Sequence, residues 1–291
     1  MKIFYHDDID GIGAAAMVYR SFIGQCSKED FVMYSYSTPF PSELVSEGET
    51  VFIVDLSFSE NSVDKLKEIL DKKCNLIWCD HHTSTMELIE KYPEYNEIKG
   101  LRDSSCSGAA LTYMYLENCK FADCPKFIRM ISDFDCWQFK IDGTLQFKYA
   151  LEARKLTPFE KIWDYLLRDS LSKRHTLLED MIEEGKAIEK YMEQWFENYR
   201  NSYSYESEIN GIKCLVCNIR ANSLVFGDKI KDYPLVAIFV YDGEKYKYSI
   251  YSDKEDIDCS KIAESFGGGG HKGAAGFTTN KQIFIKRRTK K

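Results

Sequence analysis

Short apolar segments and helix-like segments alternate through the first 80 residues, and this alternation limits the possible folds more than any other feature of the chain. Strand-like and helix-like stretches are expected, in order, at residues 2–6, 11–23, 31–37, 51–55, 62–72 and 76–80. Residues 51–54 are all apolar, which indicates a strand buried on both faces. Strands that alternate with helices predict a parallel sheet with helices on its faces.

The remainder of the chain changes character twice. Helical spacing dominates the middle, where helices are expected at residues 108–117, 125–131, 159–167 and 177–199. Further strands are expected at residues 212–219, 235–241 and 244–251, followed by a short helix at residues 260–266. The Asp242-Gly243 pair between the last two strands is a hairpin turn signal.

These segments predict an α/β protein with two domains. An N-terminal parallel-sheet domain with flanking helices is expected at residues 1–175, a helical connector at residues 176–204, and a smaller C-terminal α/β domain at residues 205–291. The alternative is that the connector is a core helix of the first domain.

The charge balance restricts the partners of the chain. It carries 39 basic and 46 acidic residues, which argues against a protein that coats long nucleic acid by bulk charge. A short anionic substrate is compatible with this balance, because metal ions can supply local positive charge. The basic stretch at residues 286–291 is expected to be a solvated terminus.

Other features bear on compartment and redox state. The apolar runs are too short to cross a bilayer, and the N-terminus reaches His6 and Asp7 almost at once, so we expect a cytoplasmic protein without membrane contact. Ten cysteines at irregular spacing predict reduced thiols. Cys214 and Cys217 form one CxxC motif, but a structural zinc site would need a second pair.

Carboxylates and imidazoles collect where the predicted strands end. The residues are His6, Asp8, Asp10, Asp55, Asp80, His81 and His82. Because ligands bind outside the carboxyl ends of parallel strands, we expect these side chains at one edge of the sheet. Divalent cations relieve the repulsion between crowded carboxylates, and a mixed Asp and His set suits Mn²⁺ or Mg²⁺. Two such ions can clamp a phosphoryl group and activate a water molecule.

The run Gly267-Gly268-Gly269-Gly270-His271-Lys272 is a second candidate site. Consecutive glycines let backbone N–H groups approach an anion, and His271 and Lys272 add donors. We expect residues 273–276 to begin a helix whose N-terminus faces a phosphate. The alternative of a flexible linker fits poorly, because aromatic residues bracket the run and no Ser-rich spacer accompanies it.

Taken together, these motifs resemble those of the DHH phosphoesterases. The runs His6-Asp7-Asp8-Ile9-Asp10-Gly11, Val54-Asp55, Asp80-His81-His82 and Asp133-Phe134-Asp135 match the four motifs of that family in order. In isolation, the last pair of carboxylates would be an ordinary cap or turn. The glycine run with His271 resembles the signature of the C-terminal DHHA1 domain. Five motifs in the right order make the resemblance specific over nearly the whole chain.

The resemblance implies a centre of two Mn²⁺ ions, with Mg²⁺ as the alternative. One metal would be held by His6 and Asp8, and the other by Asp10 and His81. Asp55 would bridge both metals. His82 would contact the scissile phosphate. Asp135 would be a further ligand, with Asp133 as the alternative. The implied substrate-binding residues in the second domain are Gly268, Gly269, Gly270 and His271.

One departure from the family concerns phosphate recognition. Many DHHA1 domains carry an Arg in a Ser-x-Arg-Ser segment, whereas the corresponding run here is Ser249-Ile250-Tyr251-Ser252. Tyr251 lacks the fixed charge and the planar fork of Arg. Lys272, at a position where many relatives have Pro, is a candidate substitute for that charge.

The resemblance therefore implies a phosphoesterase that hydrolyses short single-stranded RNA or DNA to mononucleotides. The enzymatic alternatives are hydrolysis of linear or cyclic dinucleotides and removal of phosphate from 3′-phosphoadenosine 5′-phosphate. A non-catalytic nucleotide sensor and a zinc or redox regulator are alternatives of another class, but a sensor would have lost metal ligands. A homodimer is among the assemblies that the sequence allows.

Overall fold

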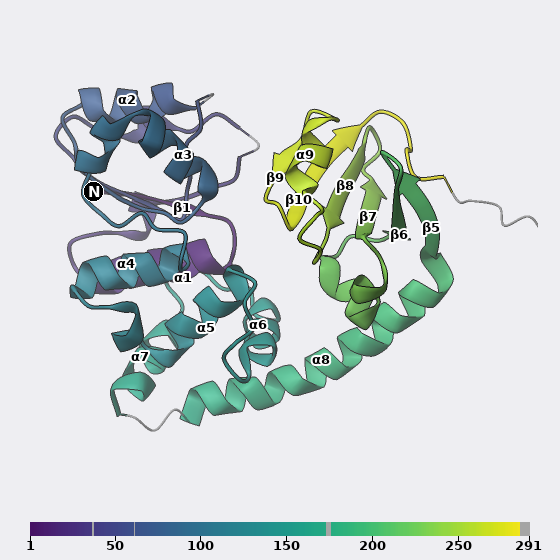
Figure 1. Cartoon of the computed structure of the whole chain (residues 1–291). Helices are drawn as coiled ribbons and strands as arrows, with labels where there is room; N and C mark the ends of the chain where they lie inside the picture. Colours follow the sequence, from purple (N-terminus) through teal and green to yellow (C-terminus); the bar gives the residue numbers. More distant parts are fainter. Residues whose placement is uncertain (37, 61, 173–175, 286–291) are drawn as a thin grey trace, which may run out of the picture. The chain divides into compact units, whose positions relative to one another are not determined.

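The computed structural model describes residues 1–36, 38–60, 62–172 and 176–285 (Figure 1). The chain divides into two compact units, Met1–Glu189 and Lys190–Lys291. The basic stretch at residues 286–291 and the predicted boundary at residue 175 lie outside the described residues. The division into residues 1–175, 176–204 and 205–291 stays a prediction.

The first unit is built on a four-stranded sheet in which all neighbouring strands are parallel. The strands are β1 (Lys2–His6), β2 (Phe31–Tyr34), β3 (Thr50–Val54) and β4 (Asn75–Cys79), in the spatial order β2-β1-β3-β4. The register pairs Tyr5 with Val54 and Val54 with Cys79, so the carboxyl ends of three strands are level. This sheet confirms the predicted fold class, although β2 is shorter than predicted.

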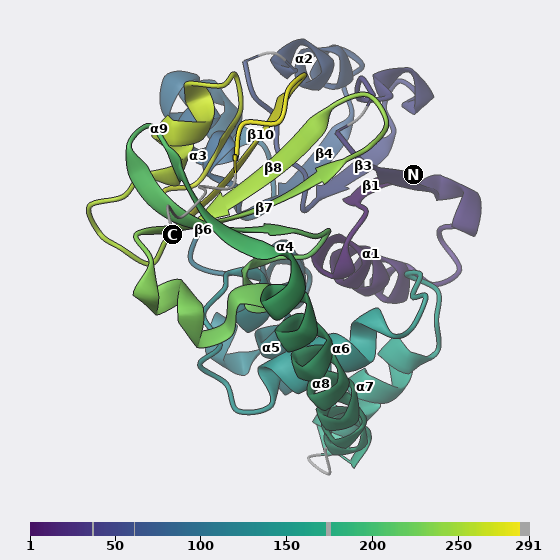
Figure 2. The same cartoon turned by 90° about the vertical axis from the view of Figure 1, so that its right-hand side faces the viewer.

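Helices cover both faces of this sheet (Figures 1 and 2). The helices α1 (Ile9–Ser21) and α4 (Gly108–Glu117) lie on one face, and α2 (Val63–Asp71) and α3 (Thr83–Lys91) lie on the other. Side chains of β3 alternate between the two cores, because Phe52 and Val54 pack on the α1 side while Ile53 packs on the α2 side. Sequence patterns predicted α1, α2 and α4 but missed α3.

Helices continue after α4 in the first unit and into the second. They are α5 (Lys126–Asp135), α6 (Thr144–Glu152), α7 (Ile162–Ser172) and α8 (Thr176–Tyr203). The helix expected at residues 125–131 extends further than predicted, because α5 includes Asp133 and Asp135 in its last turn. No sequence pattern indicated α6. The long helix α8 is continuous across the division between the two units.

The second unit contains a six-stranded mixed sheet of order β5-β6-β7-β8-β10-β9. The strands are β5 (Ser204–Ile209), β6 (Ile212–Asn218), β7 (Leu235–Tyr241), β8 (Tyr246–Tyr251), β9 (Gly269–Gly270) and β10 (Ala274–Thr279). β6 and β7 are parallel, and the other neighbours are antiparallel. The predicted hairpin turn at Asp242-Gly243 is confirmed, and its Asp242 N–H donates to the Lys245 carbonyl oxygen at 3.1 Å.

The prediction of a helix beginning at residues 273–276 was wrong. Residues from Ala274 form β10, which pairs with β8 on one side and with β9 on the other. The short helix predicted at residues 260–266 is present as α9 (Cys259–Glu264), which precedes the glycine run. The backbone of β10 pairs closely with β8 and β9, and this pairing overrides the helical preference of Ala.

The cysteines of the CxxC motif point to opposite faces of β6. Cys214 packs in the apolar cluster that contains Phe277, and Cys217 packs in the cluster that contains Phe196. Side chains three residues apart on a strand alternate in this way. This pair therefore does not converge on one metal ion.

Short 3₁₀ helices fill several connections. They are η1 (Lys28–Asp30), η2 (Ser42–Leu44), η3 (Pro93–Glu97), η4 (Phe121–Asp123) and η5 (Ser223–Asp232). Within the described residues, no helix has both the length and the apolar character that are needed to cross a bilayer.

Candidate active site

Polar side chains from three strand ends meet at the carboxyl edge of the first unit's sheet. His6 is the last residue of β1, Asp55 follows β3 directly, and Asp80, His81 and His82 follow β4. Because β3 lies between β1 and β4, the three ends are neighbours. The sequence pattern predicted this convergence, and the distances below describe it.

Asp55 lies at the middle of this edge in a constrained backbone conformation. Its φ of 55° is in the left-handed region, which costs a non-glycine residue of order 1–2 kcal/mol. Its N–H donates to the Cys79 carbonyl oxygen at 2.9 Å. A Cβ atom on Gly108, the first residue of α4, would lie 2.6 Å from Asp55 Cβ. Only glycine at position 108 lets α4 approach Asp55 this closely.

His81 faces three carboxylates. Its Nε2 atom lies 3.2 Å from Asp135 Oδ2, 3.3 Å from Asp55 Oδ1 and 3.8 Å from Asp10 Oδ2. These carboxylates come from α5, from the end of β3 and from α1. One imidazole therefore joins three segments that are distant in sequence.

His6 and Asp8 approach Asp55 from another side. His6 Nδ1 lies 2.7 Å from Asp8 Oδ2 and 3.7 Å from Asp55 Oδ2. The other oxygen of Asp8 accepts the Gly11 N–H at 2.9 Å and caps α1, which fixes the direction of the carboxylate. Since the two oxygens of Asp55 face different histidines, its carboxylate lies between them.

Asp10 is bound to the start of α4. Its Oδ2 accepts the Gly108 N–H at 2.7 Å, and its Oδ1 accepts the Ala109 N–H at 3.0 Å. These amides lack acceptors within their own helix, and the helix N-terminus attracts negative charge. Each carboxylate oxygen has a second lone pair, so Asp10 keeps the capacity to bind a cation.

The two candidate carboxylates at the end of α5 have different surroundings. Asp135 Oδ2 lies beside His81, as described above. Asp133 instead accepts the N–H groups of Lys140 and Ile141, each at 2.8 Å, and the Thr144 hydroxyl at 2.6 Å. The geometry therefore favours Asp135 as the residue at the site, whereas the hydrogen bonds of Asp133 fix the loop that follows α5.

His82 is oriented by Asp80, whose role the sequence pattern did not identify. His82 Nδ1 lies 2.7 Å from Asp80 Oδ1 and 4.0 Å from Asp55 Oδ1. The Thr85 hydroxyl donates to the other oxygen of Asp80, which is fully buried. Asp80 thus fixes the imidazole of His82, and its burial beneath a strand end could be recognised only in three dimensions.

Crowding perturbs the ionisation of these groups when no cation is present. Burial, followed by the charge of Asp10, raises the pKa of Asp55 and of Asp135 well above the usual range. Burial alone would lower the pKa of His6, but contacts with Asp55 and Asp8 outweigh it and raise that pKa to about 10. The cluster therefore carries more negative charge than its burial can accommodate without protons or cations.

The donor set fits divalent cations. Within the described residues, the ligand atoms of His6, Asp8 and Asp55 lie within 4.8 Å of one another. The same holds for Asp55 with His81 and His82. Neither carboxylate oxygen of Asp55 accepts a hydrogen bond in the described parts of the chain, although both are buried. Buried carboxylates are normally satisfied, so these two oxygens fit an ion that binds between the histidines.

The glycine run of the second unit forms a tight hairpin rather than a helix start. Gly269 and Gly270 pair with β10, and the His271 N–H donates to the Ala274 carbonyl oxygen at 2.7 Å. A Cβ atom at Gly268 would lie 2.2 Å from the Gly276 oxygen, and Gly270 has a φ of 146°. His271 and Lys272 lie at the exposed tip. Two of the glycines are therefore required by the hairpin itself.

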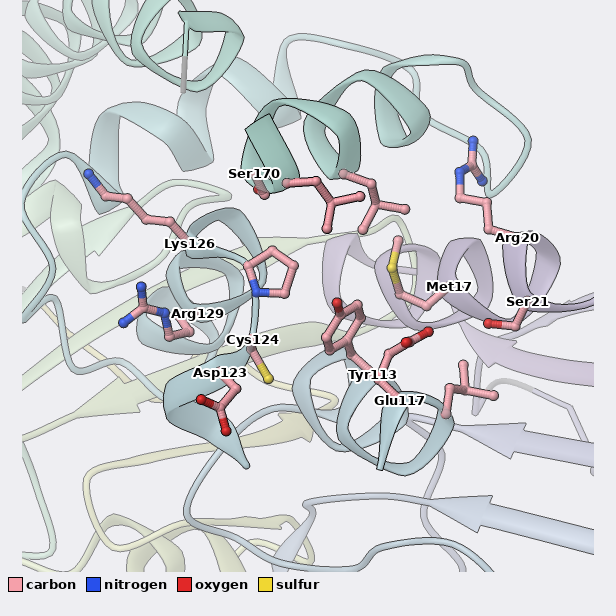
Figure 3. Close-up of a pocket in the computed structure, with 14 residues that line it drawn as sticks. Met17, Arg20, Ser21, Tyr113, Glu117, Asp123, Cys124, Lys126, Arg129 and Ser170 are labelled. Carbon is pink, nitrogen blue, oxygen red and sulfur yellow. The ribbon is translucent and has the colours of Figure 1, made fainter. Parts of the chain in front are cut away.

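A cavity of about 650 Å³ lies elsewhere in the first unit (Figure 3). Side chains of α1, α4, α5 and α7 line it, including Met17, Tyr113, Glu117 and Arg129. None of the candidate metal ligands contributes to its lining. The sequence pattern gave no indication of this cavity, and it is separate from the site at the strand ends.

Comparison with known families identifies the chain. Residues 1–133 match the DHH family, N-terminal domain, and residues 217–289 match the DHHA1 domain. The chain belongs to the DHH family. The family relates this DHH protein to the phosphoesterases, among them the relative named an oligoribonuclease below.

Individual relatives are distant. Uncharacterized protein R106 of Acanthamoeba polyphaga mimivirus is 28% identical over 94% of the chain, which spans 66% of that relative. Oligoribonuclease NrnB of Bacillus subtilis is 19% identical over 97% of the chain and 73% of its own length. The pGpG-specific phosphodiesterase PggH of Vibrio cholerae has a TM-score of 0.53 at 12% identity, covering 96% of this chain and 93% of PggH. That last likeness is one of fold.

Proposed function

We propose that this DHH chain is a divalent-metal-dependent phosphodiesterase that hydrolyses short single-stranded RNA or DNA to mononucleotides. The observation that carries the proposal is the Asp55 carboxylate, which is buried, accepts no hydrogen bond in the described parts of the chain, and is placed between His6 and His81. An ion-binding carboxylate between two imidazoles suits phosphoryl transfer better than it suits redox or structural roles.

The ligand assignment follows the side of Asp55 on which each group lies. His6 and Asp8 would hold one Mn²⁺ ion, Asp10, His81 and Asp135 would hold the other, and Asp55 would contact both. When bound, the ions would lower the pKa of a water molecule and neutralise charge on the phosphoryl group. Mg²⁺ is the alternative ion, because the same oxygen ligands suit it.

His82 would act on the substrate. Its Nδ1 atom is engaged by Asp80 at 2.7 Å, so Nε2 is the nitrogen that would meet a phosphate oxygen. The His82 side chain is 27% exposed, whereas that of Asp55 is 1% exposed. An imidazole held in this way would stabilise charge that develops on a non-bridging oxygen.

An exposed aromatic residue beside the site favours a substrate that carries bases. Trp137 follows Asp135 by two residues and is 47% exposed. Its φ is 54°, Phe139 has a φ of 49°, and their rings meet edge to face at 5.0 Å. Backbone strain of this kind persists where the surroundings impose it and is concentrated at functional sites. Stacking of a base on Trp137 would give affinity without strict sequence preference.

The hairpin of the second unit would bind the end of the substrate. Gly268, Gly269 and Gly270 lack side chains and would let a phosphate approach the backbone closely, while the Gly268 N–H itself donates to the Ala263 carbonyl oxygen at 2.9 Å. His271 and Lys272 at the exposed tip would add side-chain donors. Tyr251 lies in β8 opposite Ala274, where many relatives carry an Arg. Lys272 would then supply the charge that this Arg provides elsewhere.

The main alternative is hydrolysis of a linear dinucleotide, the substrate class of PggH, which is a pGpG-specific phosphodiesterase. The fold likeness to PggH and the relationship to NrnB are both compatible with the site described above. Substrate length separates the two proposals, because a dinucleotide-specific enzyme would leave longer strands intact.

The test is hydrolysis of 5′-labelled RNA and DNA oligonucleotides of two to ten residues, with Mn²⁺ or with EDTA. Metal-dependent release of mononucleotides, fastest on the shortest RNA, is the expected result. Cleavage of dinucleotides alone would favour the alternative. A chain that cleaves none of these would refute the proposal and direct attention to 3′-phosphoadenosine 5′-phosphate and to a binding role.

A matched pair of variants links the activity to the site. Asp55→Asn removes the charge between the histidines and should abolish turnover. Asp228→Asn changes an exposed carboxylate in the second unit and should leave turnover unchanged. Near-normal turnover in a folded Asp55→Asn protein would contradict the proposed arrangement.

A further inference from the structure

Cys136 is a thiol at the candidate metal centre to which the family motifs assign no role. It caps the C-terminal end of α5, directly after Asp135, and its N–H donates to the Ser132 carbonyl oxygen at 3.0 Å. Its sulfur, a ring nitrogen of His81 and a carboxylate oxygen of Asp135 all lie within 4.8 Å of one another. In the described parts of the chain, it is the only cysteine in any such group.

A second observation shows that this end of the site is open to a ligand. The Asp55 carboxylate is 1% exposed, neither of its oxygens accepts a hydrogen bond among the described residues, and Oδ1 lies 3.3 Å from His81 Nε2, which itself lies 3.2 Å from Asp135 Oδ2. His81 therefore joins the group that contains the thiol and Asp135 to the buried Asp55 carboxylate. Donors to a single tetrahedral ion at 2.0–2.3 Å lie about 3.6 Å apart, so small side-chain rotations would bring these atoms to one ion.

The two ends of the centre differ in chemical softness. The group at the other end, His6, Asp8 and Asp55, offers only nitrogen and oxygen ligands. Thiolate prefers Zn²⁺ and other thiophilic ions, whereas carboxylate and water suit Mn²⁺ and Mg²⁺. In a centre with one thiol end and one oxygen-rich end, the two positions would therefore prefer different ions.

We propose that Cys136 is a metal ligand that makes the His81 end of the centre thiophilic, so that this position binds Zn²⁺, Co²⁺ and Cd²⁺ more tightly than the His6 end does. The inference rests on the proposed metal centre but not on the choice of nucleic acid as substrate. It gives the chain a specificity-determining residue for the metal, and it predicts that zinc competes with manganese at one of the two positions.

Cobalt spectroscopy tests the proposal without an activity assay. Co²⁺ is added stepwise to the metal-free full chain, and the thiolate-to-cobalt charge-transfer band is recorded together with the visible ligand-field bands. The first equivalent should produce the charge-transfer band in the wild-type chain. Cys136→Ser should lose that band but keep the ligand-field bands, because the imidazole and carboxylate ligands remain. Cys119→Ser, at a half-buried thiol away from the site, should match the wild type.

Metal affinities provide the second measurement. Cys136→Ser should weaken Zn²⁺ binding by roughly tenfold or more, as expected when one ligand is removed, and should change Mn²⁺ binding little. A charge-transfer band that persists in Cys136→Ser, or equal losses of zinc and manganese affinity, would overturn the role of Cys136. A wild-type chain that binds cobalt without any charge-transfer band would do the same. A wild-type chain that binds no cobalt would instead refute the metal centre on which the proposed function depends.

Discussion

Replacing Asp133 and Asp135 at the end of α5, one at a time, would distinguish a structural carboxylate from a metal ligand. Asp133 accepts three hydrogen bonds, from two backbone N–H groups and the Thr144 hydroxyl, and is 6% exposed. Asp135 faces His81 and the other site carboxylates. We therefore expect Asp133→Ala to lower the stability of the chain, and Asp135→Ala to reduce the stabilisation that the chain gains from Mn²⁺.

The magnitudes follow from these contacts. Loss of three hydrogen bonds at about 1 kcal/mol each predicts that Asp133→Ala lowers the free energy of unfolding in EDTA by about 3 kcal/mol. Burial and the charge of Asp10 raise the pKa of Asp135, so its ionised form is disfavoured without a cation. Asp135→Ala should therefore change the free energy of unfolding in EDTA by less than about 1 kcal/mol, or raise it.

The assay is urea unfolding followed by tryptophan fluorescence, in EDTA and in Mn²⁺. Three of the four tryptophans, Trp78, Trp137 and Trp163, lie in the first unit, so the signal reports mainly on the unit that contains the site. At a Mn²⁺ concentration about 100 times Kd, the wild-type chain should gain about 2.7 kcal/mol. Asp135→Ala should lose most of this gain, whereas Asp133→Ala should keep a measurable part of it.

Two results would refute this reasoning. One is an Asp133→Ala protein that unfolds at the wild-type urea concentration in EDTA, since the three hydrogen bonds would then contribute nothing. The other is an Asp135→Ala protein with the full stabilisation by Mn²⁺. In that case the fourth motif would act through a different residue, and Asp133 would again be the candidate ligand.

Three further predictions concern contacts at the same site. Gly108→Ala should destabilise the chain by about 1–3 kcal/mol in thermal unfolding, because its Cβ would lie 2.6 Å from Asp55 Cβ. The matched control is Gly13→Ala, whose Cβ would have its nearest contact at 3.4 Å, and this change should be neutral or stabilising. Trp137→Ala should weaken dinucleotide binding by about 5- to 150-fold in calorimetry, the value of one stacked base, with unchanged Mn²⁺ affinity. EDTA should abolish hydrolysis, and Mn²⁺ should restore it; activity that survives exhaustive chelation would contradict a metal-dependent mechanism.

The sequence was most informative where chemistry and topology coincide. Apolar runs that end in His6, Asp55 and His81 predicted both the parallel sheet and the edge at which these side chains meet. Parallel strands place their carboxyl ends together, so residues distant in sequence could be grouped without any knowledge of their contacts. The sheet order and the distances at this edge bear out that grouping.

Other parts of the structure depend on contacts that no local pattern reveals. The role of Asp133 depends on backbone N–H groups seven and eight residues later, and only the folded loop brings these groups to it. Residues 273–276 have helical composition, but pairing with β8 and β9 makes them part of a strand. The polar edge strand β5 and the thiol of Cys136 were missed because neither hydrophobic period nor cysteine spacing marks them.

The contact between Asp10 and α4 has a consequence for the order in which the chain folds. The Asp10 carboxylate binds amides of residues 108 and 109, and Asp135 reaches His81 from still further along the chain. Contacts of such long sequence separation form slowly, because a long loop must close before they contribute. During synthesis the three strand ends emerge well before α4 and α5 can dock on them. Uptake of metal at the position of Asp10, His81 and Asp135 would therefore have to wait for these helices, whereas His6, Asp8 and Asp55 can come together earlier.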